Sequence, residues 1–296
     1  MDTAKDIEMF DGFSLDTVKL PEATLRVRHG GSGSPVLLLH GHPRTHATWH
    51  RVAPLLAKKH YVVCPDLRGF GQSSKPEDTP DHAGSSKRAK ARDCIALMRH
   101  LGYQRFAVIG HDRGSYTAFR MAMDHPEVVT HLGILDGVPI LEALERCNAQ
   151  FATKWWHWFF FGQPDIPEQA ILANPDRWYG GTAEAMGADA YRDYQAAIHD
   201  PATVHGMVED YRAGLGIDRT HDEVDRQESR KVECPTMILW SLRDDLELLY
   251  GDVLAVWEPW TTQQRGRGVD CGHHMAEEVP EELAREIIKF LGQWRD

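Results

Sequence analysis

The chain has 296 residues, 42% of them hydrophobic, which suits one large α/β domain with an insertion, or two domains. Its formal net charge of −11 argues against nucleic acid as a partner, and any anion site must be local because the overall field does not attract anions. No run of residues approaches the roughly 20 apolar positions that a membrane-spanning helix needs, and residues 1–6 lack the apolar segment of a signal peptide. The five cysteines are widely spaced without a C-x-x-C pair, so we expect reduced thiols in a cytoplasmic protein.

Short apolar runs alternate with helical stretches along the chain. The runs that we expect to be strands cover residues 36–39, 61–64, 107–109, 132–135 and 237–240. Residues 87–101 and 281–291 carry apolar side chains at helical spacing. This alternation predicts an α/β fold with a mostly parallel central sheet and helices on both of its faces. Functional residues should then follow the carboxyl ends of the strands.

The alternation stops between about residues 138 and 230. This stretch is rich in tryptophan, tyrosine and helix-forming residues, with several prolines and a Gly-Gly pair, and the strand pattern resumes at residue 234. An insertion of this length after a late strand indicates a helical cap over the strand ends. We therefore predict a core domain made of residues 1–138 and 231–296, and a cap domain made of residues 139–230.

The pentapeptide at residues 110–114, Gly-His-Asp-Arg-Gly, lies between the expected strand at 107–109 and a stretch at 115–123 that reads as helix. Small residues two places on either side of one reactive residue, between strand and helix, form the layout of a nucleophile elbow. The usual serine at its centre is replaced by Asp112. A carboxylate can attack a saturated carbon by displacement and leave an alkyl ester on the protein. The expected leaving groups are a halide or the oxygen of a strained epoxide.

Hydrolysis of such an ester needs a general base and an acid that orients it. His273 precedes the expected C-terminal helix and is the best candidate for the base. Two residues compete for the role of the acid: Asp136 follows the strand at 132–135, and Asp244 follows the strand at 237–240. The position of each residue after a strand leaves both open.

The loop at residues 40–43, His-Gly-His-Pro, offers backbone N–H groups for half of an oxyanion hole, and the N–H of Arg113 offers the other half. A metal site made of His40, His42, His46 and His50 is the alternative for this region. No carboxylate or cysteine pattern accompanies these histidines, so we expect no metal. No glycine loop of the phosphate-binding kind precedes a helix, so we expect no organic cofactor.

With these motifs the chain resembles the α/β-hydrolase family and, within it, the fluoroacetate (haloacetate) dehalogenases, over nearly its whole length. The matching segments are residues 38–43, 45–46, 49–54, 110–114, 135–136 with 139, the pair at 157–158, residues 209–214, 272–273 and 277–278. The resemblance implies that Asp112 is the nucleophile, His273 the base that activates water, and Asp136 its partner.

The resemblance also implies two binding sites. His157, Trp158 and Tyr211 should form the halide pocket, and an imidazole N–H, an indole N–H and a phenol O–H are neutral donors suited to a departing anion. Arg113 should hold the substrate carboxylate by charge-assisted hydrogen bonds. The family's second arginine, three residues later, is replaced here by Tyr116, which carries no positive charge.

This departure puts the substrate in doubt. Loss of one charged contact costs about 1.5–3 kcal/mol if nothing replaces it. Arg44 is a candidate substitute cation, and His42 stands where the family has an aromatic hydrophobe, so Arg113, Tyr116 and His42 are the expected substrate-binding residues. A longer haloacid, a haloamide or ester, or a neutral compound would suit such a pocket.

The leading hypothesis is a hydrolytic dehalogenase that converts short 2-haloacids to 2-hydroxy acids, with the haloacid as its small-molecule partner. The first alternative is an epoxide hydrolase with the same aspartate, histidine and acid, for which Tyr211 and Tyr116 could protonate the epoxide oxygen. The second is a catalytically silent binding protein of the same fold. Relatives of this family are often homodimers, although no feature of this sequence specifies an assembly.

Overall fold

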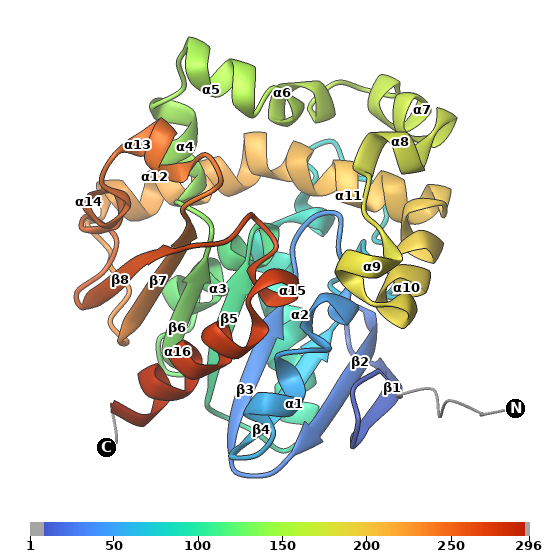
Figure 1. Ribbon diagram of the computed structural model, residues 1–296. Helices are drawn as coiled ribbons and strands as arrows, with labels where there is room; N and C mark the ends of the chain where they lie inside the picture. Colours follow the sequence, from blue (N-terminus) through green and yellow to red (C-terminus); the bar gives the residue numbers. More distant parts are fainter. Residues whose placement is uncertain (1–8, 294–296) are drawn as a thin grey trace, which may run out of the picture.

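The computed structural model describes residues 9–293, so residues 1–6, where we expected no signal peptide, lie outside the described part (Figure 1). One sheet of eight strands forms its centre. The strands are β1 (Phe13–Lys19), β2 (Thr24–Gly31), β3 (Ser34–Leu39), β4 (His60–Pro65), β5 (Phe106–His111), β6 (Val129–Leu135), β7 (Thr236–Ser241) and β8 (Gln264–Val269). Their order across the sheet is β1-β2-β4-β3-β5-β6-β7-β8. Strand β2 pairs antiparallel with both β1 and β4, and all other pairs are parallel.

Helices connect the strands and form the insertion between β6 and β7. The α-helices are α1 (Ala53–Leu56), α2 (Lys87–His100), α3 (Arg113–Asp124), α4 (Ile140–Glu145), α5 (Ala149–Lys154), α6 (His157–Phe161), α7 (Ile166–Ala173), α8 (Pro175–Tyr179), α9 (Ala183–Met186), α10 (Ala188–Ile198), α11 (Pro201–Ala213), α12 (Arg219–Gln227), α13 (Leu246–Tyr250), α14 (Val253–Trp257), α15 (Met275–Glu278) and α16 (Pro280–Gln293). Two 3-10 segments, η1 (His46–Trp49) and η2 (Ala83–Ser85), and a π-helical segment, η3 (Gly214–Asp218), complete the elements.

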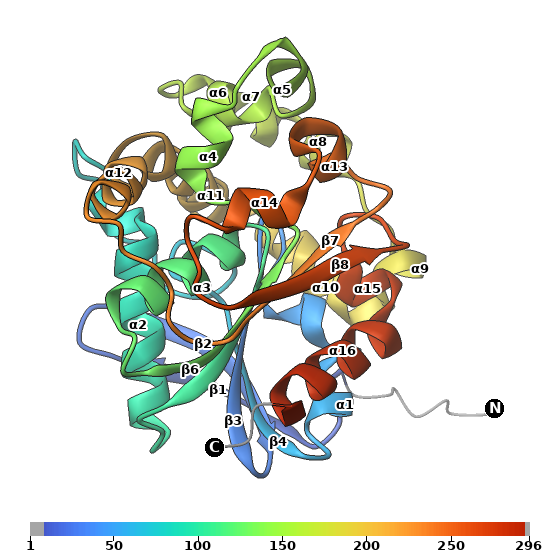
Figure 2. The same cartoon turned by 90° about the vertical axis from the view of Figure 1, so that its left-hand side faces the viewer.

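The α/β fold with a mostly parallel central sheet, which the strand pattern predicts, is confirmed. Each of the five apolar runs lies within a strand, from β3 to β7, and the two predicted helices correspond to α2 and α16. Because successive side chains of a strand point to opposite faces, Leu37 and Leu39 of β3 pack in one core while Val36 and Leu38 pack in the other. The first core lies under α2 and α3, and the second under α1 and α16 (Figure 2).

The strands that sequence analysis missed are β1, β2 and β8. In β1 and β8 only one residue each is fully buried, Val18 and Val269. Edge strands exposed in this way lack the continuous apolar run of a central strand, so their sequences resemble loops. Strand β2 alternates buried Leu25 and Val27 with less buried residues, which is the half-buried strand pattern that we did not use.

The segment at 139–230, which we expect to be the cap, contains helices α4 to α12. Several of them, including α5, α6 and α11, lie across one end of the sheet (Figure 1). No helix in the described residues is long and apolar enough to cross a membrane. All five cysteines are free, and Cys64, Cys94 and Cys271 are buried.

Candidate active site

Asp112 lies on a tight turn between β5 and α3. Its backbone has φ 50° and ψ −120°, a region that residues other than glycine rarely adopt. The chain approaches itself closely on both sides of this turn. A Cβ atom at Gly110 would lie 2.2 Å from the carbonyl oxygen of Gly114, and one at Gly114 would lie 2.4 Å from that of His40. The two flanking glycines therefore allow the turn that presents the Asp112 side chain at the end of the sheet.

One carboxylate oxygen of Asp112 is already bound by the backbone. The N–H of His42 donates to Oδ1 of Asp112 over 2.6 Å. Gly41 makes room for this contact, because a Cβ atom there would lie 2.3 Å from the same oxygen. No hydrogen bond joins the N–H of Arg113 to Asp112 within residues 9–293, so one of the two expected donors is engaged here. Oδ2 of Asp112 lies 3.8 Å from Nε2 of His273, beyond direct hydrogen-bond distance.

Both candidate acids contact the same nitrogen of His273. Nδ1 of His273 lies 2.7 Å from Oδ2 of Asp136 and 2.9 Å from Oδ2 of Asp244. The Asp136 contact has hydrogen-bond geometry, and the other oxygen of Asp136 accepts the backbone N–H of Ser241 over 3.0 Å. The Asp136 side chain is 1% exposed and that of Asp244 is 30% exposed. The structure thus places both acids between which the sequence left a choice against the same nitrogen of His273.

The charges of this cluster shift the pKa values of its members. Burial opposes a charge on His273, but the hydrogen bonds and charges of Asp136 and Asp244 outweigh it and hold the pKa of His273 well above 6.5. Burial raises the pKa of Asp136. Burial also acts to raise the pKa of Asp244, yet its contact with His273 lowers it overall. The two carboxylates together favour the protonated form of His273.

Asp112 and His273 line a cavity of about 320 Å³, within the range typical of small-molecule sites. His157, Trp158 and Tyr211 line the same cavity from helices α6 and α11. These three side chains form no hydrogen bond with the described part of the chain. Burial lowers the pKa of His157 to about 4, so its imidazole is neutral at pH 7 and retains one N–H donor. The cavity thus combines a carboxylate with three uncommitted neutral donors.

Arg113 is placed differently from our expectation. Its side chain is 1% exposed and does not line the cavity. Nε and Nη2 donate to the Asp210 carboxylate and carbonyl, while the guanidinium lies 4.0 Å from the ring centroid of Tyr211. This geometry does not favour the direct contact between Arg113 and the substrate carboxylate that the resemblance implies. Within the guanidinium of Arg113, Nη1 is the nitrogen that has no hydrogen-bond partner among the described residues.

Tyr116 and His42 do line the cavity. The Tyr116 hydroxyl forms no hydrogen bond with residues 9–293, and its ring lies 6.1 Å from that of Trp158. Both ring nitrogens of His42 are buried without a hydrogen-bond partner in the same part of the chain. Burial lowers the pKa of His42 to about 3, so this imidazole is neutral and supplies no positive charge.

The geometry does not favour Arg44, the candidate substitute cation, as a replacement for the missing arginine. Its Nε and Nη2 donate to the Glu277 carboxylate over 2.8 and 3.2 Å, and its guanidinium lies 4.8 Å from the ring centroid of Tyr194. The pair is buried, with side-chain exposures of 6% and 4%. Arg44 is absent from the lining of the cavity that holds Asp112.

The four loop histidines do not form a metal-ligating group within residues 9–293. His46, for example, contacts Asp66 over 2.7 Å, and Nε2 of His40 accepts the N–H of Leu67. Three other groups have a spacing that a metal ion could use. Two include His273, one with Asp136 and Asp244 and the other with His111 and His274, and the third consists of Asp78, His205 and Glu209. Nδ1 of His273 already contacts Asp136 and Asp244, and the ring of His205 already contacts Glu168 and Asp78.

Asp210, behind the cavity, is a functional residue that the sequence did not indicate. This buried carboxylate contacts Arg113, Lys87 and Lys90. The three cations lie at least 97 positions away along the chain, so no local spacing reveals the cluster. Its only sequence signal is its place within the family-like segment 209–214.

Comparisons with known proteins agree with this geometry. A sequence model described as "alpha/beta hydrolase fold" matches residues 34–280. The chain is 41% identical over 296 residues to a fluoroacetate dehalogenase from Burkholderia sp, covering 97% of this chain and 96% of that protein. It is 31% identical over 277 residues to a soluble epoxide hydrolase from Corynebacterium sp. (strain C12), covering 90% and 92%. The crystal structure of ALR0039, a putative α/β hydrolase from Nostoc sp PCC 7120, has a TM-score of 0.92 at 41% identity and covers 96% of this chain and 99% of that one.

Proposed function

We propose that this chain, which belongs to the α/β-hydrolase fold family, is a hydrolytic dehalogenase of substrates with a halogen on the carbon next to a carbonyl group, short 2-haloacids among them. The observation that carries the proposal is the shared cavity. It combines the Asp112 carboxylate with uncommitted donors on His157, Trp158 and Tyr211.

The first step is a displacement at carbon by Asp112. Oδ1 is held by the N–H of His42, so Oδ2 is the oxygen free to attack. As the new C–O bond forms, the C–X bond breaks and the halide leaves with the electron pair. The N–H and O–H donors of the cap then replace part of the water that hydrates the departing ion. The product of this step is an alkyl ester of Asp112.

The second step hydrolyses this ester with water. Nε2 of His273, 3.8 Å from Oδ2 of Asp112, accepts a proton from water, and the resulting hydroxide attacks Cγ of Asp112. The N–H of His42 stabilises the negative charge on the carbonyl oxygen. When the bond from Cγ to the alkyl oxygen breaks, the alkoxide takes the proton back from His273 and leaves as the hydroxy product. Asp112 is left as a carboxylic acid, and it releases its proton to water to restore the carboxylate. Asp136 and Asp244 stabilise the protonated imidazole between these transfers.

Halide release from chloroacetate, fluoroacetate and 2-chloropropionate tests the proposal, with Asp112→Asn as the blank. We expect release by the wild-type protein that disappears in the variant. Single turnover in ¹⁸O-labelled water should place the label in Asp112 and leave the product unlabelled, because the alcohol oxygen comes from the carboxylate. No halide from any of the three substrates would contradict the haloacid reading.

Epoxide hydrolysis is the second candidate, favoured by one specific observation. Tyr116 and Tyr211 both line the cavity of Asp112 with hydroxyls that form no hydrogen bond to the described chain. Two phenols could protonate the oxygen of an opening epoxide. Diol formation from styrene oxide, lost in both Tyr116→Phe and Tyr211→Phe, would favour this function over dehalogenation.

A further inference from the structure

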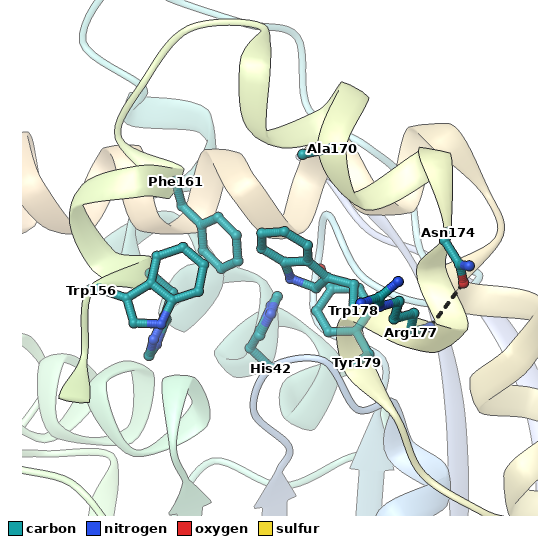
Figure 3. Close-up of a pocket in the computed structure, with 9 residues that line it drawn as sticks. His42, Trp156, Phe161, Ala170, Asn174, Arg177, Trp178 and Tyr179 are labelled. Carbon is teal, nitrogen blue, oxygen red and sulfur yellow. Dashed lines mark hydrogen bonds between the residues drawn. The ribbon is translucent and has the colours of Figure 1, made fainter. Parts of the chain in front are cut away.

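A second, larger cavity lies in the cap. Its volume is about 540 Å³, and four aromatic rings line it together with two histidines, Ala170, Asn174 and Arg177. Figure 3 shows Trp156 and Phe161 on one side of His42, with Trp178 and Tyr179 on the other. Helices α6 and α8 supply three of these rings, Phe161, Trp178 and Tyr179, and the fourth, Trp156, lies half exposed just before α6. The cavity thus has an apolar wall of a size that suits a small aromatic group.

This cap cavity adjoins the cavity of Asp112. His42 and His157 line both of them, and His42 contributes the N–H that holds the nucleophile. The rings of Phe161 and Tyr179 lie 5.5 and 5.1 Å from that of His42. A substrate that extends past His42 would therefore place its tail among the aromatic rings while its reacting carbon stays beside Asp112.

His42, which lines both cavities, and Tyr179, which lines the cap cavity beside it, carry polar atoms without a partner in the described chain. Nδ1 and Nε2 of His42 and the hydroxyl of Tyr179 are buried and have no hydrogen-bond partner in the described chain. His42 is 9% exposed. Buried polar groups normally have partners, so these atoms point to a ligand that supplies them. A neutral imidazole offers one donor and one acceptor, which match the C=O and N–H of an amide.

The cations near the cavity of Asp112 already have carboxylate partners. Lys154 lines this cavity and pairs with Asp245 over 3.3 Å, while Arg113 donates to Asp210 and Arg44 to Glu277. Tyr116, which also lines the cavity, stands in place of the second arginine. A substrate carboxylate would have to compete with these partners. A neutral carbonyl group needs no such cation. We propose that the preferred substrate is a neutral 2-haloamide whose N-aryl group occupies the cap cavity and whose amide contacts His42. This inference rests on the proposed dehalogenase function and names its substrate class.

Three chlorinated substrates distinguish the effect of the negative charge from the effect of the aromatic group: chloroacetate, 2-chloroacetamide and N-phenyl-2-chloroacetamide. We expect kcat/KM to rise in this order, with a gain of about tenfold from the phenyl group, the scale of one well-packed aromatic contact. Trp178→Ala should lower kcat/KM for the anilide about tenfold more than for chloroacetamide. Phe159→Ala is the matched control, because Phe159 is 38% exposed on the same layer of the cap and lines neither cavity.

The inference is overturned if chloroacetate is the best of the three, or if Trp178→Ala affects the anilide and chloroacetamide equally. Failure of the dehalogenase function itself would look different, since none of the three substrates would then release chloride. A binding measurement covers that case: titration of Asp112→Asn with N-phenylacetamide, which has no halogen, followed by tryptophan fluorescence. Saturable binding that Trp178→Ala weakens and Phe159→Ala preserves would support the tail site, and absence of binding would overturn it.

Discussion

Asp136 and Asp244 follow different strands, yet their carboxylates lie 2.7 and 2.9 Å from one atom, Nδ1 of His273. Strands β6 and β7 are adjacent and parallel, so their carboxyl ends meet at the same edge of the sheet. The N–H of His273 points to one carboxylate at a time, and either can orient the ring. The site therefore contains two potential partners for one base.

From this arrangement we predict that the two acids substitute for one another. Asp136→Asn and Asp244→Asn should each reduce kcat by about 10- to 100-fold, while the double variant should lose about 10⁴-fold, the loss seen when a catalytic histidine has no acid. Mass spectrometry should show the alkyl ester accumulating in the double variant, because displacement by Asp112 precedes the step that needs His273. If Asp136→Asn alone reaches the full loss, Asp244 does not support the base.

The pH dependence of the reaction should report the raised pKa of His273. The base must be neutral to accept a proton from water, so the rate of ester hydrolysis should rise with pH through a pKa above 6.5. Removing the charge of Asp244 weakens the preference for the protonated ring, which moves the acidic limb of kcat to lower pH. Single-turnover rates of product release between pH 5 and pH 10 would measure the acidic limb in the wild type and in Asp244→Asn. An acidic limb below pH 6.5 in the wild type would contradict this prediction.

Gly41 should be essential for activity rather than for folding. A Cβ atom there would lie 2.3 Å from Oδ1 and 2.4 Å from Cβ of Asp112, so Gly41→Ala displaces the nucleophile from the N–H of His42. We expect kcat to fall by about 10²- to 10³-fold, as for loss of one oxyanion donor, while the thermal midpoint changes little. Gly216→Ala is the control, because no atom lies within 4 Å of a Cβ there. Activity of Gly41→Ala close to that of the wild type would show that the carboxylate tolerates the shift.

The fold could be predicted from sequence because its central strands are fully buried and read as continuous apolar runs. The role of Asp112 could also be predicted from a local pattern, because a tight turn between a strand and a helix requires glycines at a fixed spacing around the nucleophile. The choice between Asp136 and Asp244 was not readable, because it depends on where two strand ends meet in space. The partners of Arg113 and Arg44 lie 97 and 233 positions away, and only the folded chain reveals that both cations are already paired.

The last prediction concerns the buried carboxylate behind the site. Asp210 contacts Lys87 over 2.9 Å, Lys90 over 2.7 Å and Arg113, and its side chain is 1% exposed. Burial alone would raise the pKa of Asp210, but the three cations hold it well below 3.8. A lowered pKa in the folded state means that the ionised form stabilises the protein above the pKa of the unfolded chain. This stabilisation is lost as the pH falls through the pKa of the folded state.

Asp210→Asn should therefore destabilise the protein by about 3–5 kcal/mol at pH 7, because it leaves buried cations without their counter-ion. Urea unfolding at pH 7 would measure the loss, and the difference from the wild type should shrink toward low pH, where Asp210 is protonated in both states. Glu223→Gln removes an exposed pair with Arg219 and should change stability by less than about 1 kcal/mol. A loss in Asp210→Asn as small as in Glu223→Gln would mean that the cations find other partners.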